Sequence, residues 1–159
     1  MEFINNSFKE FHEKVKKPNL ADIEFIPFGN RKESYNQETQ KFEFTCQHGE
    51  NECYGNLIET CAIQTLGKIK SYDTILCIES NIENFKLDFD KTLEYCFSDD
   101  EAHLELIKEC VTSDIGNIYE HQMASKTTDH KWVPWVIVDG VHDENVENQI
   151  LESLIDYLC

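Results

Sequence analysis

The densest group of chemically reactive side chains in this sequence lies between residues 46 and 61. The segment Cys46-Gln47-His48-Gly49 is followed by Glu52-Cys53, and Cys61 comes after it. Thiols and an imidazole at such short spacing fit three kinds of chemistry. They can bind zinc, pair a cysteine nucleophile with a histidine base, or close disulfides that hold the chain together.

The spacing favours disulfides over the other two. A zinc site would use Cys46, His48, Cys53 and Cys61, but the segment has no tight Cys-x-x-Cys pair and places two of these sulfurs on a predicted helix. A nucleophile would pair a cysteine with His48, but nearness in sequence does not by itself bring sulfur to imidazole. We therefore interpret the sulfurs as disulfide staples and His48 as a local structural residue, and we predict no metal and no cofactor.

The number of cysteines points to an oxidising compartment. Seven cysteines in 159 residues is high usage, and they are spread along the chain. Residues 1–20 have no apolar run of the kind found in secretory signals, so we expect that an N-terminal segment with the export signal is missing. A cytosolic protein with reduced thiols is the alternative. An odd count leaves at least one thiol unpaired, and the predicted disulfide cysteines are Cys46, Cys53, Cys61, Cys77, Cys96, Cys110 and Cys159.

Charge excludes two classes of partner. The formal charge is −17, from 31 acidic and 14 basic residues, which disfavours binding to phosphate backbones and anionic lipid. No run is long and apolar enough for membrane insertion, so we predict neither nucleic acid nor membrane as a partner. The triplet Asn5-Asn6-Ser7 is an N-glycosylation pattern and adds little support for a secreted glycoprotein. We interpret the basic cluster as a solvated rim; it consists of Lys14, Lys16, Lys17, Arg31 and Lys32.

Apolar periodicity predicts the elements before this segment. Residues 3–16 have the spacing of an amphipathic helix, ended by Pro18. Residues 21–28 are short and apolar, which predicts a buried strand. The polar stretch 30–41 has no periodicity and is predicted as a surface loop, although Phe42 and Phe44 alternate as in a short strand.

Helices are predicted through the middle of the chain. One begins near Cys53 and ends at Gly67, and others are expected near 72–82, 86–96 and 100–111. Asp114 is predicted to cap a further helix. The apolar side of that helix would be Ile115, Ile118, Tyr119 and Met123.

The C-terminal part predicts a strand, a turn and a helix. Residues 132–138 are nearly all β-branched or aromatic, as expected of a strand covered on both faces, and Asp139-Gly140 is a turn dipeptide. These elements predict an α/β fold and a single domain, 1–159, with a cysteine-rich helical insertion at about 46–125. The face of the last helix would be Val146, Ile150, Leu151, Leu154, Ile155 and Leu158.

Taken in order, these segments resemble one known family. CQHGENEC at 46–53, with Asn56 and Cys61, closely matches the signature of gamma-interferon-inducible lysosomal thiol reductases, the GILT family. Gln47, His48 and Gly49 belong to that signature. Further matches cover essentially the whole chain: IPFGN at 26–30, CIES at 77–80, Cys96, Cys110 and WVPWVIVDG at 132–140.

The resemblance implies a thioredoxin-like sheet and an oxidoreductase. Members of the family are thiol reductases that reduce the disulfides of proteins in an acidic lysosomal or endosomal lumen, so the implied partners are disulfide-bonded or unfolded protein substrates. The resemblance also implies a cis proline loop beside the redox pair. Val133 and Pro134 are therefore the predicted substrate-binding residues.

The chain departs from the family at its redox pair. The family carries a Cys-x-x-Cys at the start of the first helix, directly after the first strand, and IPFGN places Met1 and Glu2 about where that motif should end. A helix N-terminus lowers the pKa of the attacking thiol, and the second thiol releases the product. We therefore predict no catalytic residue in these 159 residues and a missing first strand. Two hypotheses remain: a truncated thiol reductase, or an inactive thioredoxin-like protein that binds substrate chains without reducing them.

Overall fold

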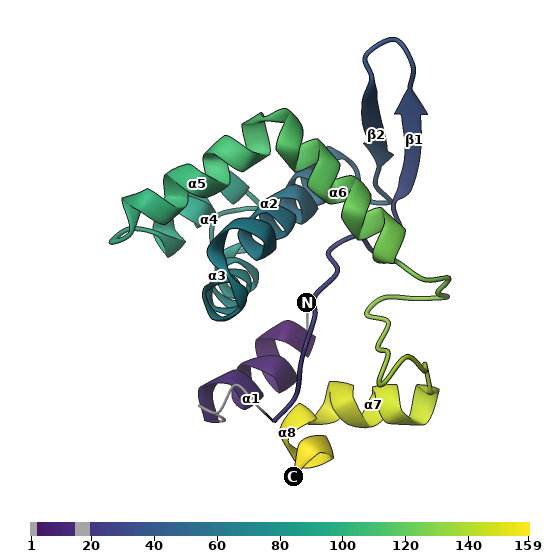
Figure 1. The fold of residues 1–159 in the computed structure, drawn as a ribbon. Coiled ribbons are helices and arrows are strands. Elements are labelled where there is room, and N and C mark those ends of the chain that lie inside the picture. Colours follow the sequence, from purple (N-terminus) through teal and green to yellow (C-terminus); the bar gives the residue numbers. More distant parts are fainter. Residues whose placement is uncertain (1–2, 15–19) are drawn as a thin grey trace. The chain divides into compact units, whose positions relative to one another are not determined.

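The computed structural model describes residues 3–14 and 20–159 (Figure 1). The chain divides into two compact units. One contains Met1–Glu24 and His130–Cys159, and the other contains Phe25–Asp129. The larger unit is therefore continuous in sequence, whereas the smaller one joins the two ends of the chain.

The larger unit is mostly helical. It begins with two strands and continues with helices that follow one another closely along the chain (Figure 1). The elements are β1 (Lys32–Asn36), β2 (Lys41–Thr45), α2 (Glu50–Leu66), α3 (Lys68–Asn81), α4 (Phe89–Cys96), α5 (Glu101–Thr112) and α6 (Asp114–Lys126). All the helices predicted from apolar periodicity between 53 and 126 are confirmed, with boundaries shifted by a few residues.

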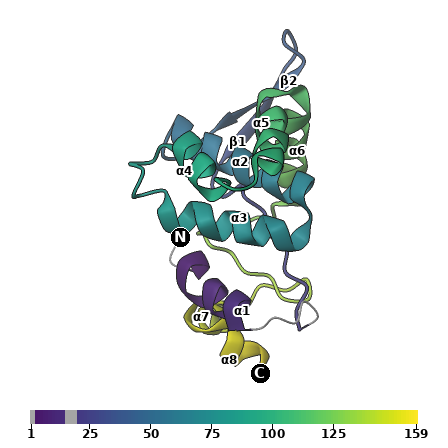
Figure 2. The same ribbon diagram turned by 90° about the vertical axis from the view of Figure 1, so that its left-hand side faces the viewer.

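Helix α2 is the centre of this unit and contacts α3, α4, α5 and α6 (Figures 1 and 2). Burial of apolar side chains against it supplies the main stabilisation of the unit. Gly67, with φ of 73°, ends the helix as predicted, in a conformation that favours glycine. The buried core cluster is Ile58, Cys61, Ala62, Ile78, Leu93, Phe97, Leu104, Ile107 and Cys110.

The two strands form an antiparallel hairpin in which Tyr35 pairs with Phe42. The figures show it extending away from the helices of the unit. The strand expected at Phe42 and Phe44 is confirmed, but the loop predicted for 30–41 is wrong because it contains β1. The register explains the error: the polar strand β1 gains its structure from pairing with β2, and the composition of β1 alone does not reveal that partner. Asn117 of α6 fixes the hairpin, since its amide hydrogen-bonds both backbone groups of Phe42.

Helix α6 begins as predicted but is capped differently. Ser113 occupies the N-cap position, and Asp114 forms an ion pair with Lys41 at 2.6 Å instead of capping. The predicted apolar side is also wrong in part, since Ile115 and Ile118 are exposed whereas Met123 is fully buried. The helix turns Gly116, Glu120 and Met123 inward because it must pass close to α5: a Cβ on Gly116 would lie 2.4 Å from the carbonyl oxygen of Cys110.

The smaller unit brings helices from both ends of the chain together. Its elements are η1 (Ile4–Phe8), a π-helical turn, α1 (Lys9–Lys14), α7 (Glu144–Glu152) and α8 (Leu154–Leu158). The predicted N-terminal helix is confirmed as far as Lys14, and the rest of it, with Pro18, lies outside the described residues. The C-terminal helix is broken at Ser153, whose hydroxyl caps α8.

Ser7 ties the two ends of the chain. Its buried hydroxyl donates to the carbonyl of Ile150 at 2.6 Å and accepts from the N–H of Leu154 at 2.7 Å. It thereby satisfies backbone groups at the junction of α7 and α8, which would otherwise be costly to bury. The same contacts occupy the hydroxyl of the Asn5-Asn6-Ser7 triplet.

The strands predicted at 21–28 and 132–138 are wrong. Residues 21–26 alternate between half-buried and exposed positions but belong to no strand, and a turn follows at 27–30. In 132–138 only Val138 pairs, with Val141 across the predicted turn Asp139-Gly140. A strand requires a partner for its backbone groups as well as an apolar composition, and the described residues provide no such partner here. The α/β prediction therefore holds only as helices with one small antiparallel sheet. Among the described helices, none has the length and apolarity to cross a membrane.

Candidate functional site

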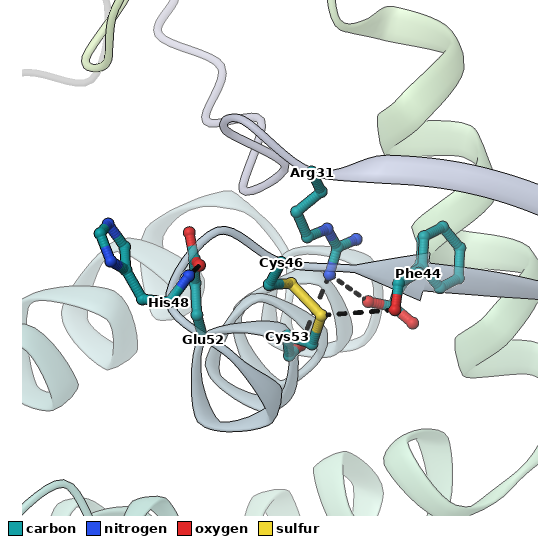
Figure 3. Close-up of a disulfide and its surroundings, with 7 residues drawn as sticks. Arg31, Phe44, Cys46, His48, Glu52 and Cys53 are labelled. Carbon is teal, nitrogen blue, oxygen red and sulfur yellow. Dashed lines mark hydrogen bonds and ion pairs between the residues drawn. A yellow bond between two sulfur atoms is a disulfide. The ribbon is translucent and has the colours of Figure 1, made fainter.

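The signature segment 46–53 leads from the end of β2 into the first turn of α2, and a disulfide closes it into a loop. A disulfide joins Cys46 to Cys53, with their Cα atoms 5.6 Å apart (Figure 3). Gly49 caps the helix with φ of 91°, a conformation that disfavours any side chain. Cys46 directly follows β2 and Cys53 lies on α2, and the glycine lets the chain reverse between them.

Polar contacts of the signature residues hold this loop in place. The backbone N–H of His48 donates to Glu52 at 2.6 Å, so the carboxylate reaches back over the start of α2 as in a capping box (Figure 3). The amide of Asn30 donates to the side-chain oxygen of Gln47 at 3.1 Å. Gln47, His48 and Gly49 are all exposed. The structural role predicted for His48 is therefore carried by its backbone, and its imidazole faces solvent.

A buried arginine lies beside the disulfide. The Arg31 side chain is fully buried, donates to Glu120 of α6 at 2.6 Å, and also reaches the carbonyl of Cys53 at 3.5 Å. Its guanidinium lies 4.7 Å from the ring centroids of both Phe28 and Phe44, within cation–π range. The sequence-based prediction of a solvated Arg31 is wrong. Arg31 is buried because the rings of Phe28, in the turn before β1, and Phe44, in β2, lie beside its guanidinium and the carboxylate of Glu120 pairs with it.

The surroundings of Glu120 disfavour the ionised form of its carboxyl. Burial raises the pKa of this carboxyl above its ordinary value, and the Arg31 guanidinium only partly offsets that effect. The pair is thus a buried ion pair whose acidic member protonates more readily than an exposed glutamate. Sequence reasoning missed Glu120; the signal was a glutamate at helical spacing from Met123, on the buried side of α6.

The sulfur of Cys53 also lies 3.7 Å from the carbonyl oxygen of Phe44 (Figure 3). A disulfide sulfur has no hydrogen to donate, so this is a van der Waals contact and not a hydrogen bond. It places the disulfide directly against the end of β2. Cys46 and Cys53 are each half-buried.

The other two disulfides lie among the helices. Cys61–Cys110 joins α2 to α5 within the buried core, and Cys77–Cys96 joins α3 to α4. Cys159 has a free, exposed thiol, so its predicted place among the disulfide cysteines is wrong. Cys159 directly follows α8, and the sequence contains no second unpaired cysteine with which it could bond.

The disulfides decide between the three chemistries of this region. Every sulfur that the zinc site or the cysteine nucleophile would have used is bonded to another sulfur. Thiolates are the species that bind zinc or attack a substrate, and these cysteines do not supply one in the oxidised form. The interpretation as disulfide staples is the one that the structure supports.

The predicted substrate-binding residues lie in the smaller unit. The Val133–Pro134 peptide bond is cis, as the resemblance implied, and both residues are exposed, Val133 by 51%. Their neighbours Trp132 and Ile137 are also exposed in part, by 37% and 42%. The segment therefore presents apolar surface to solvent.

A buried glutamate anchors this segment by two hydrogen bonds. Glu147 of α7 is only 2% exposed and accepts from the indole N–H of Trp132 at 2.5 Å and from the backbone N–H of Val136 at 2.7 Å. The two bonds lie on either side of Val133–Pro134 in the chain. His142 stacks on Trp135 with ring centroids 3.4 Å apart, and its Nδ1 lies 3.0 Å from the carbonyl of Val136.

Sequence reasoning missed Glu147 and His142. Glu147 was detectable as the one acidic residue on the predicted apolar face of the last helix, at helical spacing from Ile150 and Leu154. A charged side chain on such a face is rarely buried without partners, and here it has two donors. The partners could not be read from the sequence, because they lie in a segment without regular structure.

Comparison with known proteins agrees with the signature. The family model for gamma interferon inducible lysosomal thiol reductase matches residues 1–100. A gamma-interferon-inducible lysosomal thiol reductase of Carassius auratus is 36% identical over 144 residues, covering 88% of this chain and 55% of the relative. The protein of that name from Mus musculus is 36% identical over 126 residues, covering 76% of this chain and 48% of the relative.

A plant relative extends the comparison. A gamma-interferon-responsive lysosomal thiol protein of Arabidopsis thaliana is 31% identical over 146 residues, covering 88% of this chain and 56% of the relative. The chain thus spans about half the length of the curated relatives it matches. On the signature loop, the family model and these relatives, the chain belongs to the gamma-interferon-inducible lysosomal thiol reductase family.

Proposed function

We propose that this chain serves in the reduction of protein disulfides as the part that holds the substrate polypeptide. The observation that carries the proposal is the exposed apolar segment around Val133 and Pro134, anchored on both sides by the buried Glu147. An unfolded or disulfide-bonded protein presents apolar side chains that would pack on this surface. The names of the relatives support thiol-dependent chemistry and a lysosomal setting.

The chemistry of reduction needs a dithiol. A thiolate attacks one sulfur of the substrate disulfide, and a second thiol then attacks the mixed disulfide and releases the reduced substrate. No two cysteines of the sequence are separated by two residues, and six of the seven are in disulfides. The proposal therefore assigns substrate binding to this chain, and the attack to a dithiol that these residues do not contain.

A thioredoxin-like sheet is part of the same proposal. The family match supports it, and the segments at 21–26 and 132–137, which form no strand here, are the ones that would join such a sheet. A chain preceded by an added strand and a Cys-x-x-Cys segment should bring both segments into regular strand pairing, detectable by hydrogen exchange of their amides.

Binding is tested with a reduced, carboxymethylated polypeptide, which offers an unfolded chain and no disulfide to exchange. The fluorescence of Trp132 and Trp135 reports its binding. Val133→Asp should weaken the binding at least tenfold, because a charge would have to be buried in the apolar contact. Val141→Asp is the matched control, since Val141 is exposed by 66% but lies beyond the turn, and it should leave the affinity unchanged. Equal effects of the two substitutions would contradict the assignment of the site.

A second candidate is an inactive member of the family that binds polypeptides and does not assist their reduction. It is favoured by the disulfide-bonded state of Cys46, Cys61, Cys77 and their partners. The two candidates differ in one assay at acidic pH. The chain preceded by an added strand and a Cys-x-x-Cys segment should reduce a protein disulfide with a supplied thiol if the proposal is correct. Binding without turnover in that extended chain would favour the inactive member.

A further inference from the structure

The Cys46–Cys53 disulfide has surroundings that the other two lack. Both cysteines are half-buried, and they lie next to the exposed Gln47 and His48 at the surface of the unit. Cys53 lies in the first turn of α2, a helix of 17 residues. The N-terminus of a helix favours negative charge and lowers the pKa of a nearby thiol.

Arg31 gives a second and independent indication. Its side chain is fully buried, and its Nε and Nη2 atoms have no hydrogen-bond partner among the described residues. In Figure 3 the guanidinium points toward the Cys46–Cys53 bond, and the carbonyl of Cys53 lies 3.5 Å from Nη1. Buried donors without an acceptor are costly, and a thiolate on Cys53 would provide the missing acceptor.

We propose that Cys46–Cys53 is an exchangeable disulfide whose opening by a low-molecular-weight thiol leaves a Cys53 thiolate held by Arg31. The thiolate of the small molecule attacks the sulfur of Cys46, which forms a mixed disulfide. The Cys46–Cys53 bond breaks, and its electron pair stays on the sulfur of Cys53. A second small thiol then attacks the mixed disulfide, so two thiols are oxidised to one disulfide, and Cys46 leaves as a thiolate that takes a proton from solvent.

The direction of opening follows from the two leaving groups. A thiol with a lower pKa leaves faster in thiol–disulfide exchange. Cys53 lies on the helix, and its carbonyl oxygen is 3.5 Å from Arg31 Nη1, whereas Cys46 belongs to the loop after β2. Attack at Cys46 therefore expels the better-stabilised thiolate.

Other charged groups around Cys53 set the size of this effect. Glu120 neutralises part of the Arg31 charge, and burial raises the pKa of Glu120, so this neutralisation weakens as the pH falls. The acidic residues in the first turn of α2 oppose a thiolate by repulsion between like charges. The groups on the elements packed around Cys53 are Glu50 and Glu52 of α2, His48 of the loop, Glu33 of β1, and Glu120 and His121 of α6.

The chain contains its own controls. Cys77–Cys96 is also half-buried, but Cys77 contacts the amide of Asn81 and not a guanidinium. Cys61–Cys110 lies in the core with exposures of 0% and 3%. A difference in opening rate between the two half-buried disulfides, Cys46–Cys53 and Cys77–Cys96, therefore reports the local chemistry of each bond more than its accessibility.

The test measures the opening of each disulfide in the full chain. Reduced glutathione is added for increasing times without any protein substrate, free thiols are alkylated, and the pairs are identified by peptide mass mapping. Cys46–Cys53 should open about tenfold faster than Cys77–Cys96, and Cys61–Cys110 last. Equal rates for the two half-buried pairs, or faster opening of Cys77–Cys96, would overturn the proposal. The result is independent of whether the chain binds or helps to reduce a substrate.

The role of Arg31 is tested by Arg31→Met together with Glu120→Met. Replacing both members of a buried ion pair by apolar residues avoids leaving a lone buried charge. The rate advantage of Cys46–Cys53 should fall severalfold, while the rate for Cys77–Cys96 in the same molecules shows that the fold is kept. An unchanged advantage would remove Arg31 from the proposal.

A separate measurement does not require this variant to fold. In the Cys46→Ser chain, Cys53 is a free thiol with Arg31 and Glu120 in place. Its alkylation rate as a function of pH should give a pKa below the ordinary value of about 8.5. A pKa at or above that value would contradict a stabilised thiolate.

Discussion

Each of the two units of this chain is stabilised internally by a different kind of interaction. The larger unit has three disulfides, one of them inside an apolar core built around α2. The smaller unit contains one cysteine, Cys159, and its thiol is free. The buried hydroxyl of Ser7 joins its two ends, and the buried carboxylate of Glu147 anchors the segment around Val133 and Pro134 to α7.

The difference shows where each unit is vulnerable. A disulfide acts largely on the unfolded chain, by limiting its freedom, and is indifferent to small shifts of the folded state. A buried polar group acts only while its partners stay in place, and it becomes a cost once one of them moves. The larger unit should therefore depend on oxidation, and the smaller one on a few single side chains.

The largest effect should come from removing the core disulfide with Cys61→Ala and Cys110→Ala. The two residues are 49 apart in sequence, and the entropy of closing such a loop corresponds to about 4 kcal/mol. Urea unfolding followed by far-UV circular dichroism, which reports the helices, should show a loss of that order. Removing Cys46 and Cys53 in the same way is the comparison, since they are 7 apart and their loop corresponds to about 2.5 kcal/mol. A larger loss from the short loop would contradict the ordering.

The next effect concerns the smaller unit alone. Glu147→Leu removes the acceptor of two donors, and leaving them unsatisfied should cost about 1 to 3 kcal/mol. The only two tryptophans, Trp132 and Trp135, lie in this unit, so their fluorescence isolates its unfolding. Glu144→Gln on the same helix is the control, because Glu144 is exposed and should change stability by less than about 0.5 kcal/mol. If both substitutions behave alike, the Glu147 bonds are not what anchors the segment.

The sequence predicted the larger unit well for a physical reason. Its helices carry local signals, such as the apolar spacing of α2 and the glycine that ends it, and these do not depend on distant residues. The same reasoning failed at β1, since that strand is polar and exists through its pairing with β2. It failed again at Arg31, whose burial depends on Glu120, far along the chain.

In the smaller unit, composition was a poor guide to secondary structure. The run at 132–138 has the residues of a strand, yet only Val138 pairs, because strand formation depends on a partner that composition does not specify. The partners of Glu147 could not be predicted for a related reason. Sequence reasoning predicted that the cysteines at 46–53 form disulfides, but it did not predict that Cys46 and Cys53 bond to each other.

A smaller effect should appear on changing pH, and it should be confined to the larger unit. Burial raises the pKa of Glu59 well above its ordinary value of 4.5, with Glu79 adding to the shift, and burial also raises the pKa of Glu79 and of Glu120. These carboxyls bind protons more readily in the folded state than in the unfolded one. The free energy of unfolding should therefore rise as the pH falls from 7 toward 4.5.

Two other groups limit this gain at still lower pH. The pKa of Asp88 and of Asp100 lies below the ordinary value of 3.8, mainly because of hydrogen bonds from Lys91 and from Lys70 respectively. Their contribution is lost only as the pH falls below that value. Urea midpoints by circular dichroism at pH 7, 6 and 5 should increase in that order, and Glu59→Gln with Glu79→Gln should flatten the trend. Glu83→Gln, at an exposed position, should not; tryptophan fluorescence should show no such trend.

The smallest effect should come from Cys159→Ser. The thiol is exposed at the end of the chain and bonded to no other sulfur, so its replacement should change the unfolding free energy by less than about 0.5 kcal/mol. Tryptophan fluorescence during urea unfolding is the measurement, at more than one protein concentration and without added thiol. The comparison between the units depends on this result, because it treats the smaller one as free of covalent support. Two results together would mean that Cys159 joins two molecules: the substituted chain is clearly less stable, and the stability of the unsubstituted chain rises with protein concentration. Both units would then rely on disulfides.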